Sequence, residues 1–571
     1  METGTKRLNL NLSARAYSEL EQLAQTNHVS MTEIVRLGIG LAKIAIDAEQ
    51  YEKAKSELKA IYQAKPSNGK AAFLLGTIYL KQNAQDSAKL FFDKGVSASE
   101  FSKLNQIGLG QIDLDNNKIA EAKTKFDLVL KDTKKKDFEE YIYVAQAYMN
   151  ADKPNYKAAI EVMLKAKLNH PENAKVLLAL GDAYYGDKNQ NDAYVAYRDA
   201  YKFDPTLIRA KMQSGVLLKG AKAYVEAEKA LNEVVAANPN YGPAYRELAE
   251  TYYYWANNQP KTYTQNIAKA LEFYKKYMSR TDYSLSSRMR YADFLILAKE
   301  YKALEVEANK MKELDNVNPR ILRYLGYAAY ENGNTDLAIK SLNDYLSNPN
   351  NKIIGRDYLY LGLAKIKKGT SADGKTIDAT LLKEAVAELN KAVEKEAIIV
   401  NEFNAIGVKF FEQKQYKEAA SIFEVGASKS DNKNYLDDNL FYGLSVYYDN
   451  NKNGVKPNIE DLQKAEIAFD NVLKSSPNYQ DAYIFKARCN RLLENDENMA
   501  KNYEAYLEKI TAKGAEEMAK PSNKSKLIES YNNIGAHYAN SDITKAKEFF
   551  NKTLLLDATN TYATDSLKSL K

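Results

Sequence analysis

The chain has 571 residues, with 81 basic and 75 acidic side chains and a formal net charge of +6. This near balance gives no support for nonspecific nucleic-acid binding along the whole chain. The single cysteine, Cys489, excludes an intramolecular disulfide. No apolar run approaches a membrane span, and the first residues lack the basic and apolar regions of a signal peptide, so we expect a soluble cytoplasmic protein with no membrane partner.

The N-terminal segment is predicted to form one strand and two helices. Residues 6–12, KRLNLNL, alternate strictly between leucine and polar residues, which is typical of a short half-buried strand. Ser13 follows at the position of a helix cap, before an amphipathic stretch. Ser30 and Glu33 have the spacing of a capping box for a second helix, from Met31 to about Asp47.

A strand, a helix, a tight turn and a capped helix in this order resemble the ribbon-helix-helix family of DNA-binding proteins. The resemblance implies a head over residues 1–48 that forms a homodimer, because a single strand needs the strand of a second chain. It also implies contacts with double-stranded DNA, in which outward strand side chains read the bases and the start of the second helix meets a phosphate. The DNA-binding positions are then Arg7, Asn9, Asn11, Ser30 and Thr32. Three interpretations remain open: a DNA-binding module, a dimerisation module without DNA, and an amphipathic cap for the rest of the chain.

From about residue 35 onward, small and aromatic residues recur with a period of about 34. The clearest unit carries Gly181, Tyr184, Ala193, Tyr197, Ala200 and Pro205. The glycine and the first alanine let two helices approach closely, the aromatics are expected to face the neighbouring hairpin, and the proline ends the second helix. With some losses, the pattern returns around Gly76, Gly110, Gly215, Gly326, Gly407, Gly443 and Gly535.

This spacing resembles the tetratricopeptide repeat. The resemblance implies an all-α fold, a right-handed α-solenoid of about fourteen helical hairpins over residues 35–571. The predicted head and array overlap, because Ala42 falls at the small position of a first hairpin, so one helix serves both. The junction is either a natural fusion or an artificial one, in which a dimerising head replaced the N-terminus of an exported bacterial protein.

In the tetratricopeptide family, the first helices of the hairpins line a groove that receives an extended peptide or a helix of a partner. Positions three before, one after and four after the small residue face this groove. They predict a partner-binding surface of Asp182, Tyr185, Arg246, Glu250, Tyr253, Arg323, Tyr327 and Tyr330. Arginine and tyrosine are common interface anchors. The alternative is that these tyrosines pack between neighbouring hairpins.

Residues 449–460 fit the EF-hand calcium pattern D-x-[DN]-x-[DN]-G-x5-E and lie between two predicted helices. The ligands would be Asp449, Asn451, Asn453, the carbonyl of Val455 and Glu460. Only two of them carry charge, so Ca²⁺ would bind weakly. The alternative is an ordinary turn in an asparagine-rich loop, and no other cofactor is predicted.

Catalytic motifs are not recognisable in the sequence. The three histidines are isolated, and no glycine loop has the setting of a phosphate site. We therefore predict a non-enzymatic scaffold that binds protein or peptide ligands through its repeats and is dimerised by its head. The alternative is a DNA-binding transcriptional regulator whose repeats sense a partner.

Overall fold

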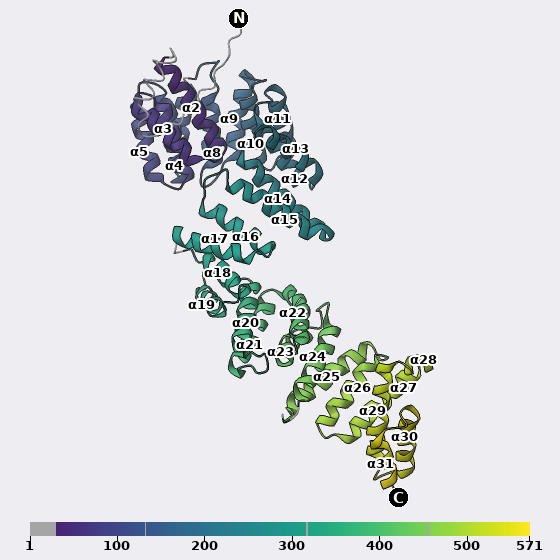
Figure 1. Cartoon of the computed structure of the whole chain (residues 1–571). Coiled ribbons are helices and arrows are strands. Elements are labelled where there is room, and N and C mark those ends of the chain that lie inside the picture. The colour runs from purple at the N-terminus through teal and green to yellow at the C-terminus, as the bar shows by residue number, and fades with distance from the viewer. Residues whose placement is uncertain (1–29, 132, 316–317, 453, 455, 571) are drawn as a thin grey trace. The chain divides into compact units, whose positions relative to one another are not determined.

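The computed structural model describes residues 30–131, 133–315, 318–452, 454 and 456–570 (Figure 1). These residues form α-helices and two short 3-10 segments, Pro260–Thr262 and Ala397–Ile399, and no strand occurs among them beyond isolated bridges. The all-α prediction is confirmed for this part of the chain. Two compact units can be distinguished, Met1–Glu300 and Tyr301–Lys571.

The first unit contains seven pairs of consecutive helices, each pair packed as a hairpin. The pairs are α2 (Met31–Asp47) with α3 (Tyr51–Ala64), α4 (Gly69–Lys81) with α5 (Gln85–Val96), α6 (Ser102–Asp115) with α7 (Ile119–Lys131), α8 (Glu139–Asn150) with α9 (Tyr156–Asn169), α10 (Ala174–Gly186) with α11 (Gln190–Phe203), α12 (Ile208–Gly220) with α13 (Tyr224–Ala237), and α14 (Gly242–Asn258) with α15 (Tyr263–Met278). Helix α16 (Leu285–Leu297) packs on α15 and completes this unit.

The second unit begins with α17 (Tyr301–Leu314), which packs against α18, and contains six hairpins. They are α18 (Arg320–Glu331) with α19 (Thr335–Leu346), α20 (Gly355–Gly369) with α21 (Ala379–Lys395), α22 (Val400–Glu412) with α23 (Tyr416–Ala427), α24 (Tyr435–Asn450) with α25 (Ile459–Ser475), α26 (Gln480–Leu492) with α27 (Asp496–Thr511), and α29 (Pro521–Tyr538) with α30 (Ile543–Leu556). The short α28 (Ala515–Met518) precedes α29, and α31 (Thr561–Ser569) packs on α30. The described residues thus hold thirteen packed hairpins, against about fourteen predicted.

The glycines of the repeat lie where a large side chain of the second helix meets the first helix; this side chain is an aromatic ring in several hairpins and leucine at Gly215 and Gly326. A Cβ atom on Gly76 would lie 2.3 Å from the ring of Phe92, and one on Gly108 in the next hairpin would also lie 2.3 Å from it. In the clearest unit, a Cβ on Gly181 would lie 2.6 Å from the ring of Tyr197. The aromatic residue therefore packs within its own hairpin and, at Phe92, also against the next one.

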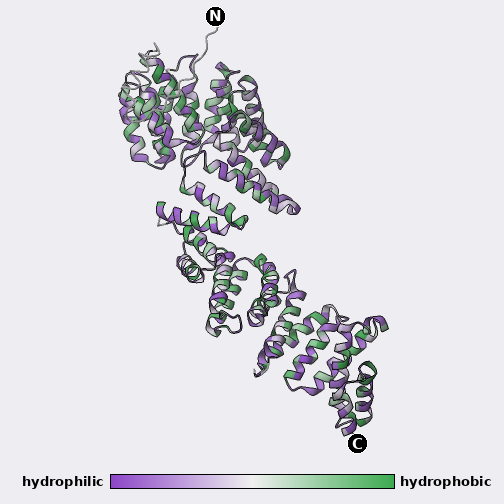
Figure 2. Cartoon of the chain, viewed as in Figure 1, coloured by the Kyte–Doolittle hydropathy of each residue, from purple (hydrophilic) through white to green (hydrophobic). Residues whose placement is uncertain are grey.

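Apolar and polar residues are interspersed along the helices, as Figure 2 shows, because each helix buries one face and exposes the other. Among the residues that the structure describes, no helix combines the length and apolar character needed to cross a membrane.

The helix predicted from Met31 to about Asp47 is α2. Ser30 caps it, since its hydroxyl accepts a hydrogen bond from the Glu33 amide at 3.2 Å, whereas the Glu33 carboxylate pairs with Arg36. Thr32 is exposed in the first turn. The predicted strand, the first predicted helix, and the candidate DNA contacts Arg7, Asn9 and Asn11 lie outside the described residues.

Candidate partner-binding site

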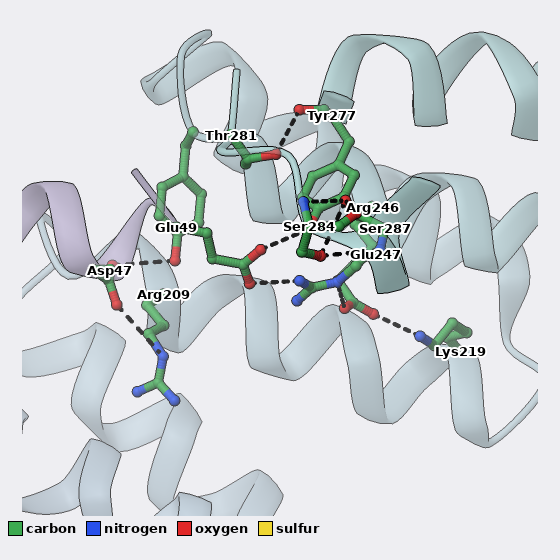
Figure 3. Close-up of polar contacts among 11 residues, drawn as sticks. Asp47, Glu49, Arg209, Lys219, Arg246, Glu247, Tyr277, Thr281, Ser284 and Ser287 are labelled. Atoms are coloured by element: carbon green, nitrogen blue, oxygen red, sulfur yellow. Dashed lines mark hydrogen bonds and ion pairs between the residues drawn. The ribbon is translucent and has the colours of Figure 1, made fainter. Parts of the chain in front are cut away.

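The turn between α2 and α3 makes contacts far along the chain. In a simple array of repeats, each hairpin touches only its neighbours. Here residues 47–52, which we call the acidic turn, bind α12, α14, the end of α15 and the loop after it. The separations run from 162 residues, at Asp47–Arg209, to 230 residues, at Gln50–Arg280. The first unit therefore closes on itself through side chains of its sixth and seventh hairpins (Figure 3).

Asp47 is the first of two carboxylates in this turn that bind a guanidinium and a phenol. Its carboxylate accepts a hydrogen bond from Tyr241 Oη at 3.1 Å and lies 3.6 Å from Nε of Arg209. Arg209 also pairs with Asp182 on α10 at 2.8 Å. Burial raises the pKa of Asp47, and Arg209 and Tyr241 offset only part of this rise.

Glu49 repeats the arrangement on the next hairpin. It forms an ion pair with Arg246 on α14 and accepts a hydrogen bond from Tyr277 Oη at 2.8 Å. Burial opposes the charge on Arg246, but Glu49 and Glu247 more than compensate and raise its pKa. Glu247 in turn binds Nζ of Lys219 at 2.6 Å (Figure 3). We call Arg209, Tyr241, Arg246 and Tyr277 the double arginine–tyrosine site.

Backbone bonds and one apolar side chain complete the contact. The amide of Asp282 donates to the carbonyl of Glu49 at 3.1 Å, and the amide of Glu52 donates to the Asp282 carboxylate at 2.6 Å. The side-chain amide of Gln50 donates to the carbonyl of Arg280 at 3.0 Å. Ala48 is buried in an apolar cluster that also contains Met212, Leu231, Val234, Tyr241, Ala244 and Leu248. The turn is thus held as a bound segment would be, by charges, backbone and a small apolar residue.

A second long-range contact lies at Glu139, the first residue of α8. Its carboxylate binds Nζ of Lys43 on α2 at 2.7 Å and also pairs with Lys70 on α4. Burial alone would raise the pKa of Glu139, but the two lysines outweigh it and lower the pKa to about 2. One carboxylate therefore joins three hairpins.

The Glu139 contact should make the stability of the first unit depend on pH. Because the folded-state pKa is about 2 against an ordinary 4.5, the contribution is fully present above about pH 4.5 and is lost as the pH falls towards 2. After allowance for solvent screening of this partly exposed group, we expect Glu139→Gln to cost about 1 kcal/mol at neutral pH and little near pH 2.5. Urea unfolding at both pH values measures this, with Glu140→Gln as the control. A Glu139→Gln effect of the same size at both pH values would contradict the assignment.

Two of the predicted groove residues in the first unit belong to the network around the acidic turn. Asp182 and Arg246 bind Arg209 and Glu49, respectively. Two others contact Arg290 on α16, in the same unit: Glu250 forms bidentate bonds with it at 2.8 and 2.9 Å, and the ring of Tyr253 lies 4.8 Å from its guanidinium. Tyr185 remains 42% exposed.

In the second unit, the predicted groove residues bind the following hairpin. Arg323 and Tyr327 are buried and both donate to the carboxylate of Asp357 on α20, at 2.7–2.8 Å. Tyr330 packs edge-on against Tyr360, and burial raises its pKa to about 12. Arg323, Tyr327 and Tyr330 therefore join neighbouring hairpins. For the two tyrosines this agrees with the alternative interpretation, in which they pack between hairpins.

The acidic turn, Arg209, Tyr241 and Tyr277 were not among the site residues predicted from the sequence. Arg209 lies at the start of α12 and Tyr241 just before α14, outside the repeat positions used for the groove. The only available signal was the pair of carboxylates spaced two apart at Asp47 and Glu49.

The predicted calcium loop is described only in part, because Asn453 and Val455 lie outside the described residues. The Asp449 carboxylate pairs with Lys452 at 2.6 Å, and the exposed Glu460 pairs with Lys464 at 3.3 Å. Asn451 donates to Tyr447 Oη at 2.9 Å. Within the described ranges, no group of three or more His, Cys, Asp or Glu side chains is placed to hold a metal ion.

Comparison with known proteins finds a family match for a part of the array. Residues 39–102, from α2 to the start of α6, match the family described as tetratricopeptide repeat. Similar solved structures include the C-terminal part of a repeat protein of this kind from Cytophaga hutchinsonii, with 27% identity, 49% of this chain and 98% of that chain covered, and a TM-score of 0.30. PilF of Pseudomonas aeruginosa has 21% identity, coverages of 36% and 89%, and a TM-score of 0.30. A tetratricopeptide repeat protein from Parabacteroides merdae has 14% identity, coverages of 54% and 98%, and a TM-score of 0.29. No curated protein matches the chain.

Proposed function

We propose that this tetratricopeptide repeat protein is a non-enzymatic scaffold that binds protein or peptide partners through the first helices of its hairpins. One observation carries the proposal: the double arginine–tyrosine site already holds a segment of the chain itself, through two carboxylates and the backbone. A surface that binds one chain segment in this way suits segments of other proteins. We expect the superhelix to be right-handed, with its first helices toward the concave side.

The first helices also carry side chains that are held in place by ion pairs. Bidentate arginine–carboxylate pairs connect consecutive first helices in both units, at Arg290–Glu250 in the first and Arg488–Glu529 in the second. Side chains that are already fixed lose little conformational entropy when a partner arrives. Tyr185, which lies on a first helix and is not buried, is then a suitable aromatic anchor.

A matched pair of tyrosine variants tests the scaffold function. Tyr185 on the first helix α10 and Tyr194 on the second helix α11 are both 42% exposed. Affinity capture with the full chain is expected to retain a partner that Tyr185→Ala weakens about tenfold, as loss of a single anchor does. Tyr194→Ala should retain it unchanged. Capture of nothing above background, or equal weakening by both variants, would argue against partner binding through the first helices.

We also propose that the N-terminal region makes the protein a homodimer. Helix α2 exposes Leu37, Leu41 and Ile44, spaced i, i+4 and i+7 on one face, and Ile44 is 63% exposed. A second copy would cover this apolar stripe. Light scattering should give about twice the monomer mass of 64.4 kDa for the wild type. The double variant Leu41→Glu/Ile44→Glu should be a monomer, because it places charges in the interface. The control variant Leu90→Glu/Ile119→Glu, on α5 and α7, should remain a dimer. A monomeric wild type, or a dimeric Leu41/Ile44 variant, would reject the interface.

A DNA-binding regulator is the second candidate function. Ser30 and Thr32 are exposed at the start of α2, as contact with a phosphate requires. The base-reading positions Arg7, Asn9 and Asn11 remain a prediction. A gel shift on a selected DNA library with the wild type and with Arg7→Ala/Asn9→Ala decides, and no sequence-specific binding by the wild type removes this candidate.

A further inference from the structure

The double arginine–tyrosine site contains the same recognition unit twice. Two carboxylates of the acidic turn each face one guanidinium and one phenol hydroxyl: Asp47 faces Arg209 and Tyr241, and Glu49 faces Arg246 and Tyr277. Ion pairs and charge-assisted hydrogen bonds of this kind suit carboxylates. The site therefore reads two carboxylates that lie two residues apart, with a small apolar residue between them.

The two arginines are held in place without the acidic turn. Arg209 pairs with Asp182 at 2.8 Å, and Arg246 lies 3.2 Å from Glu247. The Arg246 guanidinium also lies 5.5 Å from the centre of the Tyr277 ring. These partners come from α10, α14 and α15, so both guanidinium groups would keep their positions if the turn left. A site that is preorganised in this way binds a replacement ligand at little entropic cost.

The contacts that hold the acidic turn are of a kind that another segment can replace. The Asp47 side chain is 43% exposed, and partly exposed ion pairs each contribute little. The only side chain of the turn in the apolar cluster is that of Ala48. The first hairpin is also held in the stack by the packing of α3 on α4, which does not involve the residues of the acidic turn that bind the arginines.

We propose that the double arginine–tyrosine site is a receptor for an acidic segment of a partner protein, with two carboxylates spaced two residues apart. In the resting chain Asp47-Ala48-Glu49 occupies the site, and the partner's segment displaces it. This inference rests on the proposed scaffold function and gives it a ligand chemistry and a form of autoinhibition. The resident turn belongs to the same folded unit and competes as an intramolecular ligand, so a partner at low concentration needs further contacts along the array to displace it.

Isosteric variants test the receptor. Asp47→Asn with Glu49→Gln removes both charges of the resident turn and leaves its size unchanged. The probe is a fluorescein-labelled peptide with the sequence of residues 44–53, IAIDAEQYEK. In fluorescence polarisation with the full chain, we expect this peptide to bind the double variant at least about ten times more tightly than the wild type. A peptide with asparagine and glutamine in place of its aspartate and first glutamate should bind neither protein.

Arginine variants locate the bound peptide. Arg246→Gln in the double-variant background should weaken peptide binding at least tenfold. The control variant, Glu121→Gln with Asp127→Asn on α7, makes the same change of charge away from the site. It should bind the peptide as weakly as the wild type does. The proposal is overturned if the double variant fails to bind the peptide up to about 1 mM, or if Arg246→Gln leaves binding unchanged.

Hydrogen exchange on the unmutated protein gives a readout that does not depend on how the variants fold. The Glu52 amide of the resident turn donates to the Asp282 carboxylate at 2.6 Å, so millimolar peptide should speed the exchange of this amide several-fold as it displaces the turn. Unchanged exchange in saturating peptide would also overturn the proposal.

The failure of the receptor and the failure of the scaffold function can be told apart. If the peptide binds and displaces the turn but Tyr185-dependent partner capture is absent, the scaffold function fails while the receptor stands. If capture succeeds and the peptide does not bind, only the receptor fails.

Discussion

Replacing Asp357 with alanine is expected to lower the free energy of unfolding of the second unit by about 3–5 kcal/mol. Asp357 is 0% exposed, and its carboxylate accepts bonds from Arg323 at 2.7 and 2.8 Å and from Tyr327 at 2.7 Å. It also accepts the Ile354 amide at 2.9 Å, at the start of α20. Without this carboxylate, the Arg323 guanidinium would be left buried and unpaired, which is the costly outcome. Urea unfolding followed by circular dichroism measures the change.

Two further variants separate the buried charge from other effects of losing an aspartate. Asp336→Ala removes an exposed carboxylate that pairs with Lys368, and should cost less than about 1 kcal/mol. Arg323→Met with Asp357→Leu removes both charges and should be much less damaging than Asp357→Ala alone. If Asp357→Ala costs no more than Asp336→Ala, the buried pair does not stabilise the junction between α18 and α20.

Phe92→Ala should cost the first unit about 3–5 kcal/mol, as is typical when a buried aromatic side chain is truncated. The Phe92 ring is fully buried and lies against the backbone of Gly76 in its own hairpin and of Gly108 in the next. Alanine would leave a cavity that the rigid helix backbones on both sides cannot fill. Chemical unfolding of the full chain, analysed at the transition of the first unit, measures this decrease in the free energy of unfolding.

The matched control is two residues away on the same helix. Leu90 is 52% exposed, so Leu90→Ala should change stability by no more than about 0.5 kcal/mol. The converse change, Gly108→Ala, should also destabilise, because the added methyl group would lie 2.3 Å from the Phe92 ring. Equal effects of Phe92→Ala and Leu90→Ala would show that Phe92 does not join the two hairpins.

The repeat could be predicted from sequence because its signal is local. The spacing of Gly76 and Phe92 follows from two helices packing within one hairpin, and the cap at Ser30 follows from the needs of one helix end. Each of these contacts lies within a few dozen residues, so the period alone places it. The helix Met31–Asp47 was predicted with the bounds that the structure gives it.

The polar contacts between hairpins could not be predicted in the same way. The period places Arg323 and Tyr327 on a first helix, but whether they face a partner or the next hairpin depends on Asp357, which follows no repeat position. The contacts of the acidic turn are even harder to predict from the sequence. Its contact with Arg209 and Arg246 depends on the small rotations between six or seven successive hairpins, and each rotation is set by packing details that the spacing does not encode.

The closed first unit has a consequence for the order of events during protein synthesis. Gln50 and Arg280 are 230 residues apart, and ribosomes add about 5–20 residues per second. About 10–50 s therefore pass between the emergence of the α2–α3 turn and that of the loop that binds it. The intervening hairpins can fold as they emerge, because each needs only its neighbour. The turn of the first hairpin is thus bound only when its unit is nearly complete, and a nascent chain halted before Tyr241 would carry Asp47 and Glu49 without Tyr241, Arg246 or Tyr277.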